Sequence, residues 1–105
     1  MKSTKKARLQ RAGWRVGDAA EFLGLSHEER RFVDLKLALA AGVRQLREQR
    51  GLTQAALAKQ IRSSQSRVAK MEAADASVSL DLMMRSLLSI GATASDIAKL
   101  IRKAA

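Results

Sequence analysis

Apolar and polar positions between residues 52 and 72 follow a helical period that is broken once, which predicts two short helices joined by a tight turn. The first helix begins after Thr53, a favourable N-cap residue. Its apolar positions lie at helical spacing and are Leu57, Ala58 and Ile61. The small side chain of Ala58 lets the second helix approach closely, as a turn of three or four residues requires.

The second helix begins after Ser63 or Ser64, either of which can act as its N-cap. Its inward positions are Val68 and Met71. Its outward face carries short polar side chains and cations, namely Gln65, Ser66, Ala69 and Lys70, with Arg67 beside them. The pattern therefore predicts a helix that is apolar on one side and polar and basic on the other.

Capping boxes predict two helices before this pair. Asp18-x-x-Glu21 opens a short helix, and Ser26-x-x-Glu29 opens the longest helix of the chain. The inward stripe of the longest helix is Phe32, Leu35, Leu39, Val43 and Leu46, widened by Leu37, Ala40 and Ala41. Gly42 weakens this helix midway, and Gly51 ends it.

Two further helices are expected after a loop of small residues, 73–78. Ser79 caps the first of them, Asp81 lies in its first turn, and Gly91 stops it. The apolar face of this helix is Leu80, Met83, Met84, Leu87 and Leu88. Thr93-x-x-Asp96 opens the last helix, whose apolar positions are Ile97, Leu100, Ile101 and Ala104.

Composition agrees with an all-α fold. The chain of 105 residues has no proline, only 3% aromatic residues and many good helix formers. Its length suits one domain of five or six helices. We expect residues 1–13 to be a basic arm that is disordered until it meets an anion, and residues 14–105 to form a single helical domain.

The distribution of charge indicates a nucleic-acid partner. The formal net charge is +10. Residues 1–13 contain no acid and five cations, which are Lys2, Lys5, Lys6, Arg8 and Arg11. Residues 14–50 are close to balanced, with seven bases against six acids, whereas residues 51–73 have four bases against one acid. Half of the surplus is thus in the arm, and most of the rest is in the predicted helix pair.

Several classes of site are excluded or disfavoured. The absence of cysteine excludes disulfides and thiolate chemistry. His27 is the only histidine and has no second ligand within helical reach, so we expect no metal and no cofactor. No nucleophile–base pair or phosphate-cradling glycine loop is present, so we expect no enzyme activity. Without an apolar run that could form a signal peptide or a membrane span, a cytoplasmic, nucleoid-associated location is expected.

The helix pair resembles a known family. Residues 52–72 are similar to the helix-turn-helix of lambda-repressor-like proteins, the XRE and Cro-type regulators. The matching residues are Leu52, Thr53, Gln54, Leu57, Ala58, Ser64, Gln65, Val68 and Glu72, followed by Ser79, Leu80 and Leu87. The similarity extends over about residues 35–91, with a reading unit at 53–72. It departs at Arg62, Ala74 and Ala76, where the family usually has glycine, or proline at the last position.

The resemblance implies a lambda-repressor-like DNA-binding domain whose second motif helix lies in the major groove. The residues expected to face base edges are Gln65, Ser66, Ala69 and Lys70. Those expected to contact phosphates are Thr53, Gln54, Arg62, Ser64 and Arg67. In the family the glutamine equivalent to Gln54 also buttresses the one equivalent to Gln65. Cations of the arm could follow phosphates or enter the minor groove.

A single module of this kind discriminates poorly, so a homodimer on a pseudo-palindromic site is expected. Candidates for the dimer seam are Ile97, Leu100 and Ile101, with the face around Leu37 as the alternative. The main functional hypothesis is a sequence-specific transcriptional regulator that represses by occupying promoter DNA. An alternative is an antitoxin that binds a partner toxin and represses its own operon. A weaker alternative is RNA or non-specific nucleic-acid binding.

Overall fold

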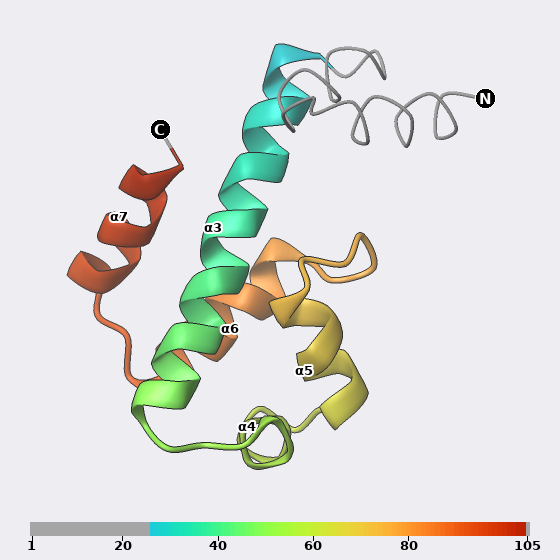
Figure 1. Ribbon diagram of the computed structural model, residues 1–105, viewed down its shortest axis with the longest axis vertical. Helices are drawn as coiled ribbons and strands as arrows, with labels where there is room; N and C mark the ends of the chain where they lie inside the picture. The colour runs from blue at the N-terminus through green and yellow to red at the C-terminus, as the bar shows by residue number, and fades with distance from the viewer. Residues whose placement is uncertain (1–25, 105) are drawn as a thin grey trace, which may run out of the picture. The chain divides into compact units, whose positions relative to one another are not determined.

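The computed structural model describes residues 26–104, which form five α-helices and contain no strand (Figure 1). The helices are α3 (His27–Gln49), α4 (Gln54–Gln60), α5 (Gln65–Glu72), α6 (Leu80–Ile90) and α7 (Ala94–Lys103). The predicted all-α fold is therefore confirmed for this part of the chain. The expected basic arm at residues 1–13 and the expected helix after Asp18 lie outside the described residues.

The first described residues, 26–34, hold the start of α3 and the capping box predicted for it. The Glu29 amide donates to Ser26 Oγ at 3.0 Å, and the Ser26 amide donates to Glu29 Oε1 at 3.1 Å. These hydrogen bonds lower the pKa of the Glu29 carboxyl. Phe32 was predicted to face inward but is 49% exposed. The first buried residue of α3 is Lys36, one turn further along the helix. Periodicity identifies a helix face but cannot tell along which turns that face has a partner.

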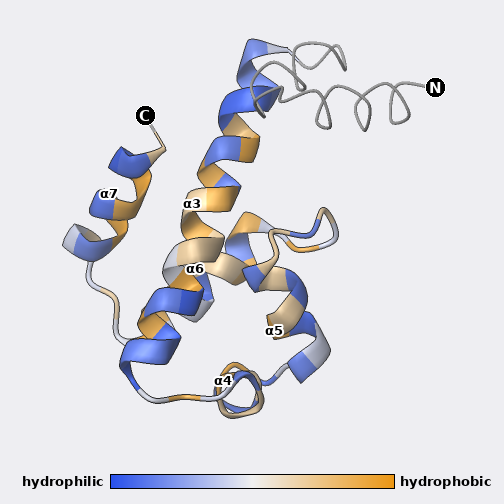
Figure 2. Ribbon diagram, viewed as in Figure 1, coloured by the Kyte–Doolittle hydropathy of each residue, from blue (hydrophilic) through white to orange (hydrophobic). Residues whose placement is uncertain are grey.

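From Leu35 onward the chain forms one compact unit with a continuous apolar core. Its fully buried centre combines residues from four helices and the loop before α6, namely Val43, Leu57, Val68, Met71, Val78, Met83 and Leu87. Hydrophilic and hydrophobic segments alternate along α3 and α7, as expected of helices with one buried side (Figure 2). In the described residues, no helix has the length and apolar character needed to cross a membrane.

Three further positions assigned to the apolar faces of α3 and α6 are exposed. Leu37 is 46% exposed, Leu88 is 55% exposed, and Ala41 also faces solvent. On α6 the buried side is turned toward Ser86 and Ile90 rather than Leu88. Ser86 is tolerated there because its hydroxyl donates to the Leu82 carbonyl at 2.8 Å. Packing against neighbouring helices, which the sequence does not reveal, selected this side of α6.

The predicted helix starts and stops are confirmed. Each of the four helices after α3 begins after a hydroxyl residue that accepts from the backbone amide three residues on: Thr53, Ser64, Ser79 and Thr93. Ser64, not Ser63, is the cap of α5. Asp96 completes the capping box of α7, and hydrogen bonds from Thr93 lower the pKa of its carboxyl. Gly51 follows α3 with φ +69°, and Gly91 ends α6 with φ +104°.

Gly42 allows α7 to pack closely on α3. A methyl group at Gly42 would lie 2.4 Å from Cδ1 and 2.7 Å from Cδ2 of Leu100, much closer than van der Waals contact. Gly42 and Leu100 are both buried. The helix-weakening glycine seen in the sequence is thus the point where the Leu100 side chain fits against the backbone of α3.

We predict that Gly42→Ala lowers the free energy of unfolding by about 1–2 kcal/mol, because the added methyl group displaces Leu100 from the core. In a Leu100→Ala background the same substitution should raise it by up to about 1 kcal/mol, since alanine is the better helix former and the clash is gone. Urea denaturation of the four proteins measures both effects. Equal effects of Gly42→Ala in the two backgrounds would contradict the proposed contact.

Candidate nucleic-acid interface

The turn between α4 and α5 has the left-handed residue that glycine usually provides. Arg62 adopts φ +56°, and the Ser63 amide donates to the Ala58 carbonyl at 2.8 Å while the Arg62 amide donates to Lys59 at 3.2 Å. This is the hydrogen-bonding pattern that closes a helix through a left-handed residue. Ala58 is 4% exposed, consistent with its predicted place at the close approach. The sequence left the conformation of this turn open, and the positive φ of Arg62 shows that a residue with a side chain occupies the left-handed position.

The two sides of α5 differ as the sequence predicted. Val68 and Met71 are fully buried, whereas the predicted base-facing side chains of Gln65, Ser66, Ala69 and Lys70 are all exposed, as is Arg67. Ser64 Oγ accepts from the Arg67 amide at 3.1 Å, which fixes the start of the helix. The buried side orients α5 rigidly, and the polar side is left free along its whole length.

The contact between Gln54 and Gln65 that the resemblance implies stays a prediction, but in this structure Gln54 has another partner. Its Nε2 donates instead to Glu72 Oε1 at 3.1 Å. The reason is that Gln54 begins α4 and Glu72 ends α5, and the two helix ends lie together in the folded unit. Thr53, beside it, accepts from the Ala56 amide at 3.0 Å and so begins α4 as predicted.

Glu72 is also the partner of Arg47, in the last turn of α3. Arg47 Nε donates to Glu72 Oε2 at 2.6 Å, and Arg47 Nη2 donates to Oε1 at 3.1 Å. The two side chains are only 11% and 5% exposed, and Arg47 Nη1 also donates to the Leu52 carbonyl at 2.8 Å. The hydrogen bonds to Glu72 raise the pKa of the Arg47 guanidinium. This network joins the end of α3, the start of α4 and the end of α5.

Arg47 was not among the functional residues predicted from the sequence. An arginine in the last turn of a long helix is favourable there through the helix dipole alone, so its position does not by itself indicate a distant partner. The available signal was Glu72, the single acid among the charged residues of 51–73. An isolated acid at the end of a basic helix indicates a cation on another element.

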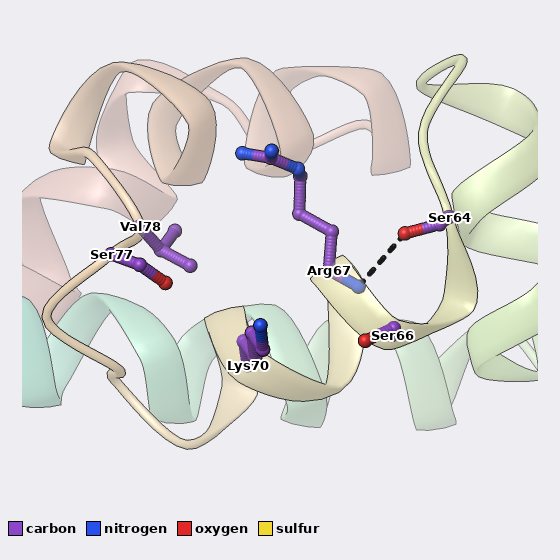
Figure 3. Close-up of a pocket in the computed structure, with 6 residues that line it drawn as sticks. All are labelled: Ser64, Ser66, Arg67, Lys70, Ser77 and Val78. Atoms are coloured by element: carbon purple, nitrogen blue, oxygen red, sulfur yellow. Dashed lines mark hydrogen bonds between the residues drawn. The ribbon is translucent and has the colours of Figure 1, made fainter.

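A polar pocket of about 210 Å³ lies beside α5. It is lined by Ser64, Ser66, Arg67, Lys70, Ser77 and Val78. Arg67 and Lys70 reach it from the helix, and Ser77 and Val78 from the loop that follows the helix (Figure 3). Two cations and three hydroxyls are groups that donate hydrogen bonds to anions. The sequence analysis had treated residues 73–78 only as a connection.

The dimer seam candidates differ in availability. Ile97 and Leu100 are each 8% exposed and belong to the core of the chain itself, whereas Ile101 is 42% exposed. Among residues 26–104 no group of three or more histidine or acidic side chains is arranged to hold a metal ion.

Comparison with known proteins identifies the motif. Residues 43–85, from the second half of α3 into α6, match the model of a helix-turn-helix family. The match is to the XRE and lambda-repressor-like helix-turn-helix family, which supports a DNA-binding regulatory module in general terms. The match covers fewer than half of the 105 residues. Comparisons with curated proteins and with solved structures gave no match.

We predict that Glu72→Gln lowers the free energy of unfolding by about 3 kcal/mol, because it leaves the buried Arg47 guanidinium without its counter-charge. Glu48→Gln is the matched control. Glu48 lies 4.0 Å from Arg47 but is 56% exposed, so its loss should cost less than about 1 kcal/mol. Urea denaturation of both variants measures the difference, and equal costs would show that the network is not held by the Arg47–Glu72 pair.

We predict that Arg62→Gly raises the free energy of unfolding by about 1 kcal/mol, because glycine adopts φ +56° without the strain of a side chain. Ala76→Gly is the control in a loop position without a positive φ, and it should be neutral or destabilising because it makes the unfolded chain more flexible. Thermal unfolding of the two variants measures the change in melting temperature that each substitution causes. A lower melting temperature for Arg62→Gly would be inconsistent with strain at the turn.

Proposed function

We propose that this protein is a sequence-specific transcriptional regulator that represses by occupying promoter DNA with α5 in the major groove. The observation that carries the proposal is the outward face of α5. In a segment of the helix-turn-helix family, this face is polar and basic, fully exposed, and backed by two completely buried side chains. A rigid helix with a free polar face is what direct readout of base edges requires.

Individual roles follow from position and chemistry. Gln65, at the start of α5, can bond an adenine bidentately through N6 and N7. Ser66 and Ala69 line the same face, and Lys70, one turn on, reaches guanine or a phosphate. Contacts to phosphate are assigned to Thr53, Gln54, Arg62, Ser64 and Arg67. The basic arm adds further phosphate or minor-groove contacts through Lys2, Lys5, Lys6, Arg8 and Arg11.

We also propose that two copies bind the two halves of a pseudo-palindromic site. Of the three seam candidates on α7, Ile101 is the one with an exposed apolar side chain, so it is the residue assigned to the contact between copies. The face around Leu37, which is 46% exposed, is the alternative seam. Half-sites about one helical turn apart would fit such a dimer.

The proposal is tested by selecting bound sequences from a pool of random duplexes at physiological salt. Enrichment of a palindromic site, bound more tightly than a shuffled duplex, supports a dimeric sequence-specific regulator. Binding without enrichment that disappears as salt rises would mean that charge alone drives association, which contradicts the proposal and favours non-specific nucleic-acid binding.

We predict that Gln65→Ala weakens binding to the selected site by about 1–3 kcal/mol, because the bidentate contact to one base pair is lost. Affinity for a shuffled duplex should not change, and the slope of binding against salt concentration should be preserved. Gln45→Ala, at an exposed glutamine on α3, is the matched control and should bind as the unmodified chain does. Equal loss on selected and shuffled duplexes would exclude a base-reading role for Gln65. Fluorescence anisotropy titration measures all of these affinities.

A further inference from the structure

Lys36 is a charged residue at a core position. Among residues 26–104 the buried polar residues are Lys36 and Ser86, and Lys36 is 9% exposed. A lysine packed against a core can keep its ammonium group satisfied by hydrogen bonds to nearby acceptors. Lys36 Nζ donates to the carbonyl oxygen of Asp75 at 3.2 Å, across 39 residues of sequence. The contact therefore ties α3 to the loop that follows α5.

The backbone of Asp75 makes hydrogen bonds that hold that loop. Its carbonyl accepts from the Val78 amide at 3.0 Å as well as from Lys36, and its amide donates to the Lys70 carbonyl at 2.9 Å. The Asp75 carboxylate accepts from the amide and hydroxyl of Ser77, which lowers the pKa of this carboxyl. Through Asp75, the Lys36 ammonium is linked to the last turn of α5 and to the wall of the polar pocket beside it.

The turn held in this way is strained. Ala74, directly before Asp75, adopts φ +55°, a left-handed conformation that is unfavourable for any residue with a side chain. Such a conformation persists only where surrounding contacts determine it. Lys36 supplies a contact from outside the turn, because it is on another helix, whereas the hydrogen bonds of Asp75 to Lys70, Ser77 and Val78 are local.

We propose that Lys36 is a positioning residue for the DNA-reading helix. By holding the Asp75 carbonyl, it keeps the strained turn at Ala74 in place and so fixes the direction of the last turn of α5, which carries Lys70. The proposal rests on the DNA-binding function proposed above. It assigns to a buried residue, which does not touch DNA, an effect on the base pairs opposite the C-terminal half of α5. The N-terminal half, with Gln65, is held independently by the Ser64 cap.

The first variant is Lys36→Met, which keeps the length and apolar stem of the side chain but removes the charge and the donor. Methionine fills a similar volume and carries no charge that must be hydrated or paired, so we expect the fold to tolerate the substitution. The Asp75 carbonyl retains the Val78 amide as donor, so no buried acceptor is orphaned. We therefore expect an unchanged or higher melting temperature together with about tenfold weaker binding to the selected site, as loss of a charge-assisted hydrogen bond allows.

Two companion variants separate positioning from general damage. Lys36→Arg keeps a charged donor and should restore most of the affinity. Adding Ala74→Gly to Lys36→Met should also recover part of it, because glycine adopts the left-handed turn without external support. In the unmodified chain, Ala74→Gly should change DNA affinity much less.

The deciding measurement is binding to single-base-pair variants of the selected site, with all affinities corrected for the folded fraction. In Lys36→Met, discrimination should fall at the base pair that is sensitive to Lys70→Ala and remain at the one sensitive to Gln65→Ala. Uniform loss at every base pair, or unchanged affinity and discrimination, would overturn the role of Lys36. Failure of the unmodified chain to select any site would instead refute the proposed function, so the two failures are distinguishable.

Discussion

The ion pair between Arg47 and Glu72 is the contact on which the geometry of the helix-turn-helix depends. Both side chains are almost fully buried, and the guanidinium binds the carboxylate through two nitrogens. A buried ion pair often adds little net stability over apolar packing, because removing both charges from water is costly. Its two-point geometry does, however, define orientation. Since Gln54 binds the same carboxylate, the pair sets how α4 and α5 meet at the end of α3.

Residues Lys36 and Arg47 stand at the two ends of the buried stripe of α3. Between them come Ala40 and Val43, so that steps of four, three and four residues keep all four positions on one side of the helix. Both cations bind groups at the C-terminal end of α5 or just beyond it, where the helix dipole places partial negative charge. The apolar residues of this stripe pack in the core that α5 also joins, and the two cations at its ends bind the C-terminal region of α5. Together these contacts fix how closely α5 packs on α3 and in which direction it points.

The local sequence does not favour the conformation at either end of α5. The helix has eight residues, too few to be stable alone in water, and a left-handed residue with a side chain stands near each end, Arg62 before it and Ala74 after it. Buried Val68 and Met71 and the contacts of Lys36 and Arg47 compensate for this weakness. The geometry of α5 therefore depends on α3, as the proposed positioning role of Lys36 requires.

The sequence by itself determined the features that obey rules within three or four residues. The hydroxyl cap at Thr53, a serine cap for α5 and the two buried positions of α5 could all be predicted, and the resemblance led from them to a predicted DNA-reading face. The conformation of the turn at Arg62 could not be predicted. The prediction placed Phe32 and Leu88 on inward faces, which was wrong, and it did not identify Glu72 as a partner of Gln54. Those features, and the roles of Lys36 and Arg47, depend on contacts across 18 to 39 residues or on where a helix face finds a partner. Only the tertiary structure decided them, because a helical period defines a face but not what that face meets.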